Sequence, residues 1–200
     1  VKGKVALITG ASGAFGAVAA RVLAGAGCSL VLAAGNKAAL DEIVAEAEGM
    51  GAAVRGVNIR PDSENACAAL VQAAVETFGR LDILVVASGM NKVARIDEMA
   101  PDTFLSVMDA NVTQSWLLAR AATRQMKAQG PDAAGRAGGK IVLVASARGL
   151  LGHPAGYTAY CASKAAVDGM TKALGCELGP TGITVNAIAP TVLRSPLTAW

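Results

Sequence analysis

Short apolar runs alternate along the chain with longer segments in which apolar positions recur at helical spacing. Each run is short, bounded by Gly, Asn or Ser, and rich in Val, Ile, Leu and Ala, which is typical of buried strands. Strands are predicted at residues 5–9, 29–34, 53–57, 81–87, 141–145 and 183–188.

The segments between these runs have the periodicity of helices. The segment after the second run has Leu40, Ile43, Val44 and Ala47 at helical spacing with acids between them, which is typical of an amphipathic helix. Further helices are predicted at residues 15–26, 63–78, 104–126 and 160–178.

Strands that alternate with helices predict an α/β fold with a doubly wound parallel sheet and helices on both faces, a Rossmann-type three-layer αβα arrangement. No linker or internal repeat divides the chain, so we expect one dinucleotide-binding and catalytic domain over residues 1–200. Residues 129–139 are expected to form a mobile surface loop. A sheet of this type usually continues after its sixth strand, so we expect a further segment after residue 200.

Composition narrows the possible functions. The net charge of +3 is small and scattered, which argues against nucleic acid as a partner. The four cysteines form no CxxC pair and the chain has one histidine, so no metal site is expected. We expect reduced thiols, no membrane-spanning segment and a cytoplasmic location.

The turn after the first strand is rich in glycine. Residues 9–16 read TGASGAFG and lie between a predicted strand and a predicted helix. A pyrophosphate can bind there to the free N–H groups of the helix start, and glycine lets the backbone approach it closely. Glycines in such a turn can also be purely structural. The residues expected at the cofactor are Gly10, Ser12, Gly13, Ala14, Phe15 and Gly16.

A second group of residues follows the fifth strand. Tyr160 and Lys164 lie four apart on one predicted helix, so the phenol and the ammonium can share a face. A nearby cation favours phenolate and would lower the pKa of Tyr160, which would make it a general acid or base. Ser146 ends the fifth strand at the carboxyl edge of the sheet, where open α/β sheets bind ligands.

With these residues in one chain, the sequence resembles the short-chain dehydrogenase/reductase family in its short-form branch, over essentially the whole length. Residues 78–85 (FGRLDILV) look like the family's lead into strand four, and residues 183–190 (ITVNAIAP) like its strand-six signature. Asn111 stands at the family's asparagine position, and Ser146, Tyr160 and Lys164 match its Ser…YxxxK set. The resemblance implies an NAD(P)-dependent enzyme that moves a hydride between nicotinamide and an alcohol or carbonyl substrate.

The resemblance also implies a role for each catalytic residue. Tyr160 would be the general acid or base, Lys164 would lower its pKa and hold the nicotinamide ribose, and Ser146 would hydrogen-bond the carbonyl oxygen. Asn111 would anchor a water relay through its backbone and amide. The alternative is that Asn111 is only a polar helix residue at a kink.

The family resemblance implies further functional residues around the four catalytic positions. The substrate pocket would contain Ser146, His153 and Tyr157. The helices that contain Phe104 and Tyr160 would pair across a two-fold axis in a homodimer or homotetramer. Beyond the glycine turn, the cofactor would contact Ala34, Gly35, Asn36, Lys37, Asn58, Ile59, Ala87, Ser88, Gly89, Tyr160, Lys164, Pro190, Leu193 and Ser195.

The chain departs from the family pattern at several positions. The middle glycine of the usual TGxxxGxG turn is Ala14, and the usual NNAG after strand four is VASG at residues 86–89. Asn58 stands for an aspartate, Thr191 for a glycine and Ser195 for a threonine. The loss of both asparagines from NNAG puts some hydrogen bonds of the central sheet in doubt.

The end of the second strand bears on the choice of cofactor. Residues 33–36 contain no acid that would accept the adenosine ribose hydroxyls, while Lys37 could pair with a 2′-phosphate. NADP is therefore favoured over NAD, although Lys37 could merely begin a solvated helix. Two rival functions stay open: a nucleotide-sensing or scaffolding protein without turnover, and an extended-branch epimerase or dehydratase acting on a nucleotide sugar.

Overall fold

The computed structural model describes residues 1–132, 134–135 and 137–191. Within these residues a six-stranded sheet runs parallel throughout, in the order β3-β2-β1-β4-β5-β6. Its strands are β1 (Val5–Thr9), β2 (Ser29–Ala33), β3 (Val54–Val57), β4 (Ile83–Val86), β5 (Gly139–Val144) and β6 (Ile183–Ile188).

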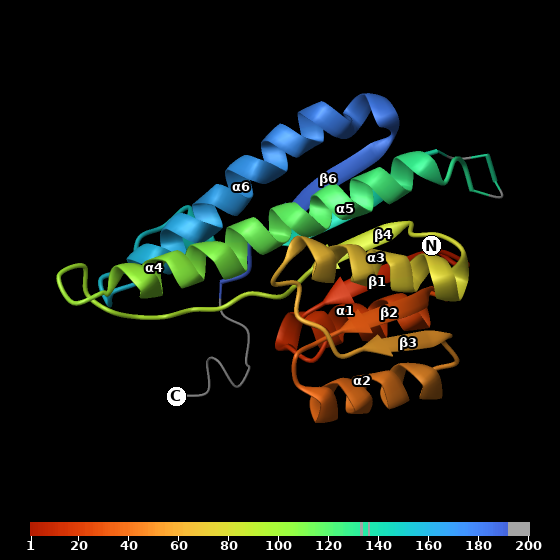
Figure 1. The fold of residues 1–200 in the computed structure, drawn as a ribbon, viewed down its shortest axis with the longest axis horizontal. Helices are drawn as coiled ribbons and strands as arrows, with labels where there is room; N and C mark the ends of the chain where they lie inside the picture. The colour runs from red at the N-terminus through yellow and green to blue at the C-terminus, as the bar shows by residue number, and fades with distance from the viewer. Residues whose placement is uncertain (133, 136, 192–200) are drawn as a thin grey trace.

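Helices connect the strands (Figure 1). They are α1 (Ala14–Gly25), α2 (Lys37–Gly49), α3 (Glu64–Phe78), α4 (Pro101–Met108), α5 (Gln114–Ala128) and α6 (Thr158–Leu178), with a π-helical segment η1 (Asp109–Thr113) and 3₁₀ turns η2 (Ala147–Gly149) and η3 (Gly179–Thr181). The strand order places β1 and β4 side by side although three helices, α1, α2 and α3, separate them in sequence. This confirms the predicted Rossmann-type three-layer fold.

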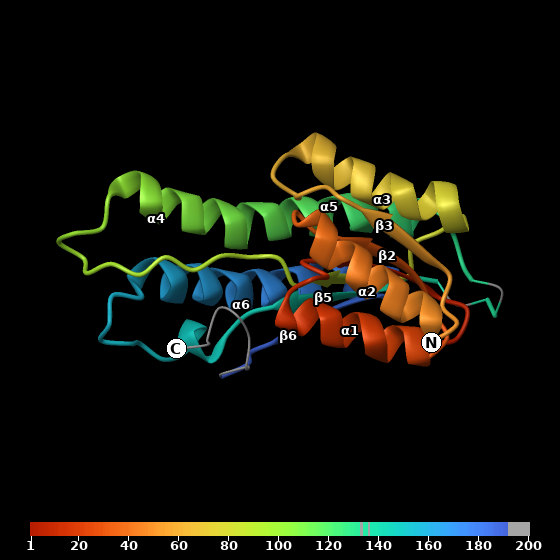
Figure 2. The same cartoon turned by 90° about the horizontal axis from the view of Figure 1, so that it is seen from below.

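The sheet divides the core into two clusters. Leu7 of β1 belongs to the core cluster that also contains residues of α3, α5 and α6, while the next residue, Ile8, belongs to the cluster with residues of α1 and α2. This alternation follows from the two-residue period of a strand. All five residues of β1 and all four of β4 are buried, as strands covered on both faces should be. Figure 2 shows the two sets of helices around the sheet.

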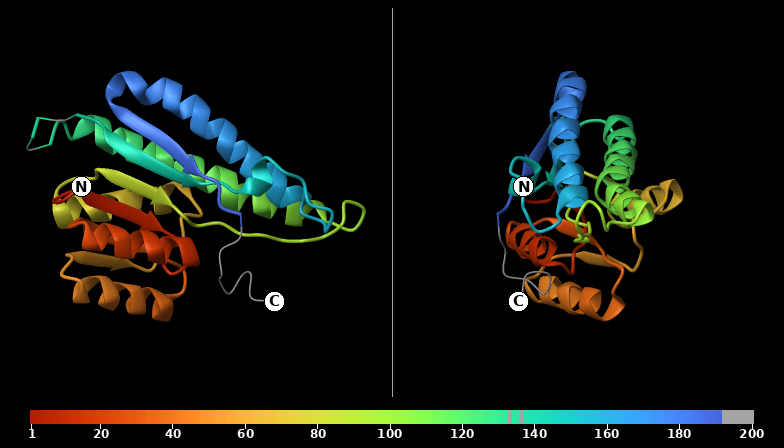
Figure 3. Two further views of the ribbon diagram at one scale, coloured as in Figure 1. Left: turned by 180° about the vertical axis from the view of Figure 1, so that it is seen from behind. Right: turned by 90° about the vertical axis from the view of Figure 1, so that its left-hand side faces the viewer.

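The predicted helix at 104–126 is wrong in its continuity and its bounds. Helix α4 starts at Pro101, which occupies the first turn, and the π-helical segment η1 separates α4 from α5, which ends at Ala128. A proline is well placed in the first turn because the N–H it lacks would have no partner there. In the end-on view of Figure 3, α5 and α6 run side by side.

The loop predicted at 129–139 begins where expected, after the end of α5 at Ala128, and ends one residue early. The Gln129 side chain accepts a hydrogen bond from the Leu81 N–H at 2.9 Å and donates one to the Leu81 carbonyl at 2.7 Å. Gly139 already belongs to β5. In the described part of the chain, no helix has the length and hydropathy that crossing a bilayer requires.

Candidate active site

The glycine turn lies at the carboxyl end of β1 and has no room for side chains. Gly10 has φ +64°, and a Cβ built on it would lie 2.6 Å from the Ala87 carbonyl oxygen. A Cβ on Gly16 would lie 2.1 Å from the Gly10 carbonyl oxygen, which also accepts a hydrogen bond from Gly13 N–H at 2.9 Å. The turn therefore holds the start of α1 directly against the end of the sheet.

The start of α1 leaves backbone donors free. Gly13 precedes the helix, and its carbonyl accepts from Ala17 N–H at 2.8 Å. No described backbone or side-chain oxygen accepts from the N–H groups of Ala14, Phe15 or Gly16. Free N–H groups at a helix start, beside a turn that a Cβ would block, fit a pyrophosphate. Ala14 is compatible with this arrangement because it is the first helical residue.

The VASG segment after β4 keeps a connection to β1. The Thr9 and Ser88 hydroxyls lie 3.0 Å apart in a hydrogen bond, so the central strands are braced although the two asparagines are missing. Gly89 follows, and a Cβ there would lie 2.6 Å from Asn111 Oδ1. Gly89 is thus required by the close approach of an asparagine from η1.

Asn111 is buried and all of its amide hydrogen-bonding groups have protein partners. Its Oδ1 accepts from Met90 N–H at 2.8 Å, and its Nδ2 donates to the Met90 carbonyl at 2.9 Å and to Ser163 Oγ at 2.9 Å. Its carbonyl accepts from the Ser115 hydroxyl at 2.7 Å. The water relay expected at Asn111 stays a prediction. Asn111 connects the segment after β4 to α6.

Ser146 lies at the end of β5, where it caps η2. Its Oγ accepts from Arg148 N–H at 3.2 Å and lies 3.5 Å from the Pro190 carbonyl oxygen. Ala147 N–H donates to the same carbonyl at 3.0 Å, which brings the end of β6 to the site. The parallel pairing of β5 with β6 explains why these residues meet.

Tyr160 lies in the first turns of α6 and is partly buried. Burial raises the pKa of its phenol, and a hydrogen bond with Ser146 opposes that rise. The expected lowering of this pKa by Lys164 is not seen. The reason is electrostatic, since loss of water around the phenol disfavours phenolate more than its neighbours favour it.

Lys164 is 5% exposed, and its Nζ donates to the Val144 carbonyl at 2.7 Å. Burial lowers the pKa of this amine to about 8, and Asp168 acts in the opposite direction. The ammonium also lies 5.6 Å from the centre of the Tyr160 ring. Ser146, Tyr160 and Lys164 therefore meet at the carboxyl end of β5, as the sequence predicts.

His153 and Tyr157, both expected in the substrate pocket, contact each other with their rings tilted by 57°. The rings of His153 and Tyr157 have centroids 4.6 Å apart, and Tyr157 also meets Tyr160 edge-on at 6.3 Å. His153 lines a pocket of about 150 Å³ together with Arg95. Their position next to Tyr160 is compatible with the expected role.

A larger cavity, of about 400 Å³, lies far from these residues at the amino end of the sheet. Lys4, Asp82 and Lys140 line it. Lys4 forms ion pairs with Asp82 and Asp132, and Arg80 also pairs with Asp82. We assign no catalysis to it, because its one carboxylate, Asp82, is held in ion pairs and open α/β sheets bind ligands at the opposite edge.

The predicted adenosine end of the site forms where β2 and β3 stop. Asn58 Nδ2 donates to the Ala34 carbonyl at 2.8 Å, and Asn36 caps α2 by accepting from Ala39 N–H. Lys37 pairs with Asp41 at 2.6 Å. Leu193 and Ser195, also expected at the cofactor, lie outside the described residues.

Sequence reasoning missed one residue here. A Cβ on Gly35 would lie 2.3 Å from Arg60 Nε, so this arginine covers the position where an acid or a base would select the cofactor. The sequence contained the information needed to find Arg60. Consecutive strands of a parallel sheet usually neighbour each other, so residues that follow the second and third strands should meet.

Comparison with known proteins identifies the family of this chain. The sequence matches the short chain dehydrogenase family over residues 4–199. It is 52% identical to the uncharacterized oxidoreductase Rv1714 of Mycobacterium tuberculosis (strain ATCC 25618 / H37Rv), covering 100% of this chain and 71% of that protein.

Two solved structures illustrate the fold. A short chain dehydrogenase from Burkholderia cenocepacia J2315 in complex with NADP is 31% identical, with a TM-score of 0.90 and coverage of 98% of this chain and 77% of that one. An NAD⁺-bound xylitol dehydrogenase is 34% identical, with a TM-score of 0.88 and coverage of 95% and 70%. The chain belongs to the short-chain dehydrogenase/reductase family of oxidoreductases.

Proposed function

We propose that the protein is an NAD(P)-dependent enzyme that transfers a hydride between nicotinamide and an alcohol or ketone. The observation that carries this is the meeting of Ser146, Tyr160 and Lys164 at the carboxyl end of β5, at the same edge of the sheet as the glycine turn. A proton donor, a hydroxyl that can bind an oxygen and a cation are what carbonyl reduction needs beside a hydride source.

The dinucleotide fits the features of the turn and the neighbouring strand ends. Gly10, Gly16 and Gly89 each lie where a Cβ would clash, and the first N–H groups of α1 are free to bind a pyrophosphate. When bound, the nicotinamide supplies or accepts the hydride. Solved relatives carry NADP in one case and NAD⁺ in another, which supports both cofactors as candidates.

The protein's own residues handle the oxygen and its proton. In the reducing direction the Ser146 hydroxyl donates a hydrogen bond to the carbonyl oxygen, and the Tyr160 phenol gives its proton to the oxygen as negative charge develops there. In the oxidising direction Tyr160 takes that proton from the alcohol. With the dinucleotide bound, Lys164 would stabilise the phenolate form of Tyr160 electrostatically and offer its ammonium to ribose hydroxyls.

The burial of Tyr160 and the hydrogen bond of Lys164 both oppose formation of the phenolate that this mechanism uses. Burial raises that pKa, and the Lys164 ammonium donates to the Val144 carbonyl. We infer that the ammonium must come closer to the phenol oxygen in the working state. The expectation is that dinucleotide binding changes the hydrogen bonds of Lys164.

The proposal is tested by screening secondary alcohols, sugar alcohols, steroids and 3-oxoacyl thioesters with both cofactors, following nicotinamide absorbance. Turnover with at least one alcohol or ketone is the expected result. Dinucleotide binding without turnover across the panel would instead favour a nucleotide-sensing or scaffolding protein.

We also propose that the protein works as a homodimer or homotetramer in the cytoplasm. The four cysteines are free thiols, as a reducing compartment requires. On α6, the small residues Ala165, Gly169 and Ala173 recur every fourth position and are exposed. Such a row lets a second helix approach closely, which supports pairing across a two-fold axis.

A further inference from the structure

Arg60 follows β3 but lies beside the end of β2. The two strands pair in parallel with Ala33 opposite Val57, so Gly35 and Arg60 leave the sheet at the same edge. The adjacent strands and α2 are visible in Figure 1. A Cβ on Gly35 would lie 2.3 Å from Arg60 Nε and 2.9 Å from Arg60 Cζ. The guanidinium therefore lies against the Gly35 backbone.

The backbone on both sides of Arg60 is held in place. Ile59 N–H donates to the Val57 carbonyl at 2.9 Å, and the Asn58 side chain donates to the Ala34 carbonyl at 2.8 Å. Pro61 follows, is buried, and its carbonyl accepts from the Cys67 thiol. The backbone of a residue before proline is restricted to extended conformations. The direction in which the Arg60 side chain leaves the backbone is therefore restricted too.

Among the residues that the structure describes, the Arg60 guanidinium has no partner that would hold it away from a ligand. No ion pair or side-chain hydrogen bond in the described residues involves Arg60. Lys37, the residue favoured by the sequence, differs in this respect. Its Nζ lies 2.6 Å from Asp41 Oδ2, so a phosphate would compete with a carboxylate one helical turn away.

The end of the second strand is where a dinucleotide-binding sheet meets the adenosine ribose. A planar guanidinium binds a phosphate through two parallel hydrogen bonds, which a lysine cannot do. We propose that Arg60, with Gly35 making room for it, is the residue of this chain that recognises the 2′-phosphate of NADP. This inference rests on the proposed dinucleotide function and assigns the cofactor preference to Arg60 in place of Lys37.

The test is a direct binding measurement by calorimetry, with NADP⁺, NAD⁺ and the fragment 2′,5′-ADP as ligands. Arg60→Ala should weaken NADP⁺ and 2′,5′-ADP binding by about 10- to 100-fold, the range of one charge-assisted contact. Its affinity for NAD⁺ should stay within about two-fold, because NAD⁺ lacks the phosphate. Arg55→Ala is the matched control, since Arg55 is an exposed arginine of β3, and its affinities should not change.

Gly35→Ala and Lys37→Ala distinguish recognition of the 2′-phosphate by Arg60 from recognition by Lys37. Gly35→Ala keeps Arg60 but displaces its guanidinium, so NADP⁺ affinity should fall with circular dichroism unchanged. A loss for Lys37→Ala as large as for Arg60→Ala would overturn the assignment. Equal losses for NADP⁺ and NAD⁺ in Arg60→Ala would overturn it too, since they indicate an adenine contact. A wild-type protein that binds neither dinucleotide would refute the proposed function itself, a result distinct from both.

Discussion

The Lys164 ammonium lies 5.6 Å from the centre of the Tyr160 ring and donates its hydrogen bond to the Val144 carbonyl. It is thus near the phenol yet bound to the end of β5. The pairing four residues apart on one helix brings the two side chains to the same site, but burial still keeps the pKa of the phenol raised.

Tyr160→Phe should lower turnover by about 10²- to 10⁴-fold, the usual contribution of a positioned general acid. The change removes one oxygen and keeps the ring, so the fold and dinucleotide affinity should survive. Ser146 cannot replace a phenol as proton donor, because an unperturbed hydroxyl does not ionise at neutral pH. Steady-state kinetics and cofactor titration measure the two quantities separately. Full activity in Tyr160→Phe would refute the mechanism while leaving the fold intact.

The buried amine of Lys164 should make the free energy of unfolding depend on pH. Its pKa is about 8 in the folded protein against an ordinary value of 10.5, so between these pH values the unfolded chain binds more protons. Stability should therefore rise with pH across this window, by up to about 3 kcal/mol from this group. Urea unfolding of the wild type and of Lys164→Met at several pH values isolates the effect. Parallel curves for the two proteins would contradict it.

Asn111→Ala should destabilise the protein by about 2–4 kcal/mol, because it leaves the Met90 N–H and carbonyl without partners. Ser163→Ala removes only the hydrogen bond between Asn111 and α6 and should cost about 1 kcal/mol. Urea unfolding compares the two variants. If they are equally stable, the bracing role of Asn111 is wrong.

Gly16→Ala should destabilise the protein by about 1–3 kcal/mol, the usual cost of overpacking. Its Cβ would lie 2.1 Å from the Gly10 carbonyl oxygen, so the whole turn must shift. Dinucleotide affinity should fall as well, since the shift moves the free N–H groups of α1. Gly49→Ala is the control, because a Cβ there meets nothing within 4 Å. Thermal unfolding and cofactor titration should leave Gly49→Ala unchanged or slightly more stable.

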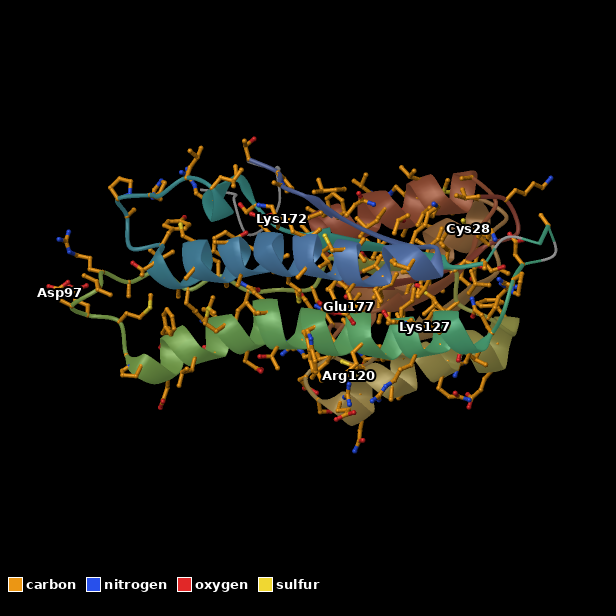
Figure 4. All side chains as sticks on the ribbon, turned by 90° about the horizontal axis from the view of Figure 1, so that it is seen from above. Cys28, Asp97, Arg120, Lys127, Lys172 and Glu177 are labelled. Atoms are coloured by element: carbon orange, nitrogen blue, oxygen red, sulfur yellow. The ribbon has the colours of Figure 1, made fainter. Side chains whose placement is uncertain are left out.

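Gly169→Arg should convert the assembled protein into monomers. Position 169 is exposed on α6, which lies beside α5 (Figure 4), and a Cβ there meets nothing within 4 Å, so the arginine fits a free subunit. A bulky charged side chain would prevent a second helix from packing closely. Light scattering at micromolar concentration gives the mass. Gly49→Arg, on α2, is the matched control, and a monomeric wild type would refute the assembly.

The local pattern of apolar and polar residues was enough to predict the strands and the main candidate site residues. The apolar runs predicted all six strands to within two residues at either end, because strand and helix periodicities are properties of neighbouring residues. The glycine turn, Ser146 and the Tyr160–Lys164 pair could be found in the same way, since each depends on spacing within one short segment.

The tertiary structure decided what depends on residues far apart in the chain. Sequence alone did not show that Asn111 is bound to Met90 and Ser163, because that requires η1, the end of β4 and α6 to meet. Nor did it show that Arg60 covers Gly35, because two strands must first pair in parallel. The same holds for the pKa of Tyr160. The cation four residues away was visible in the sequence, whereas the burial that outweighs it exists only once the helix packs on the sheet.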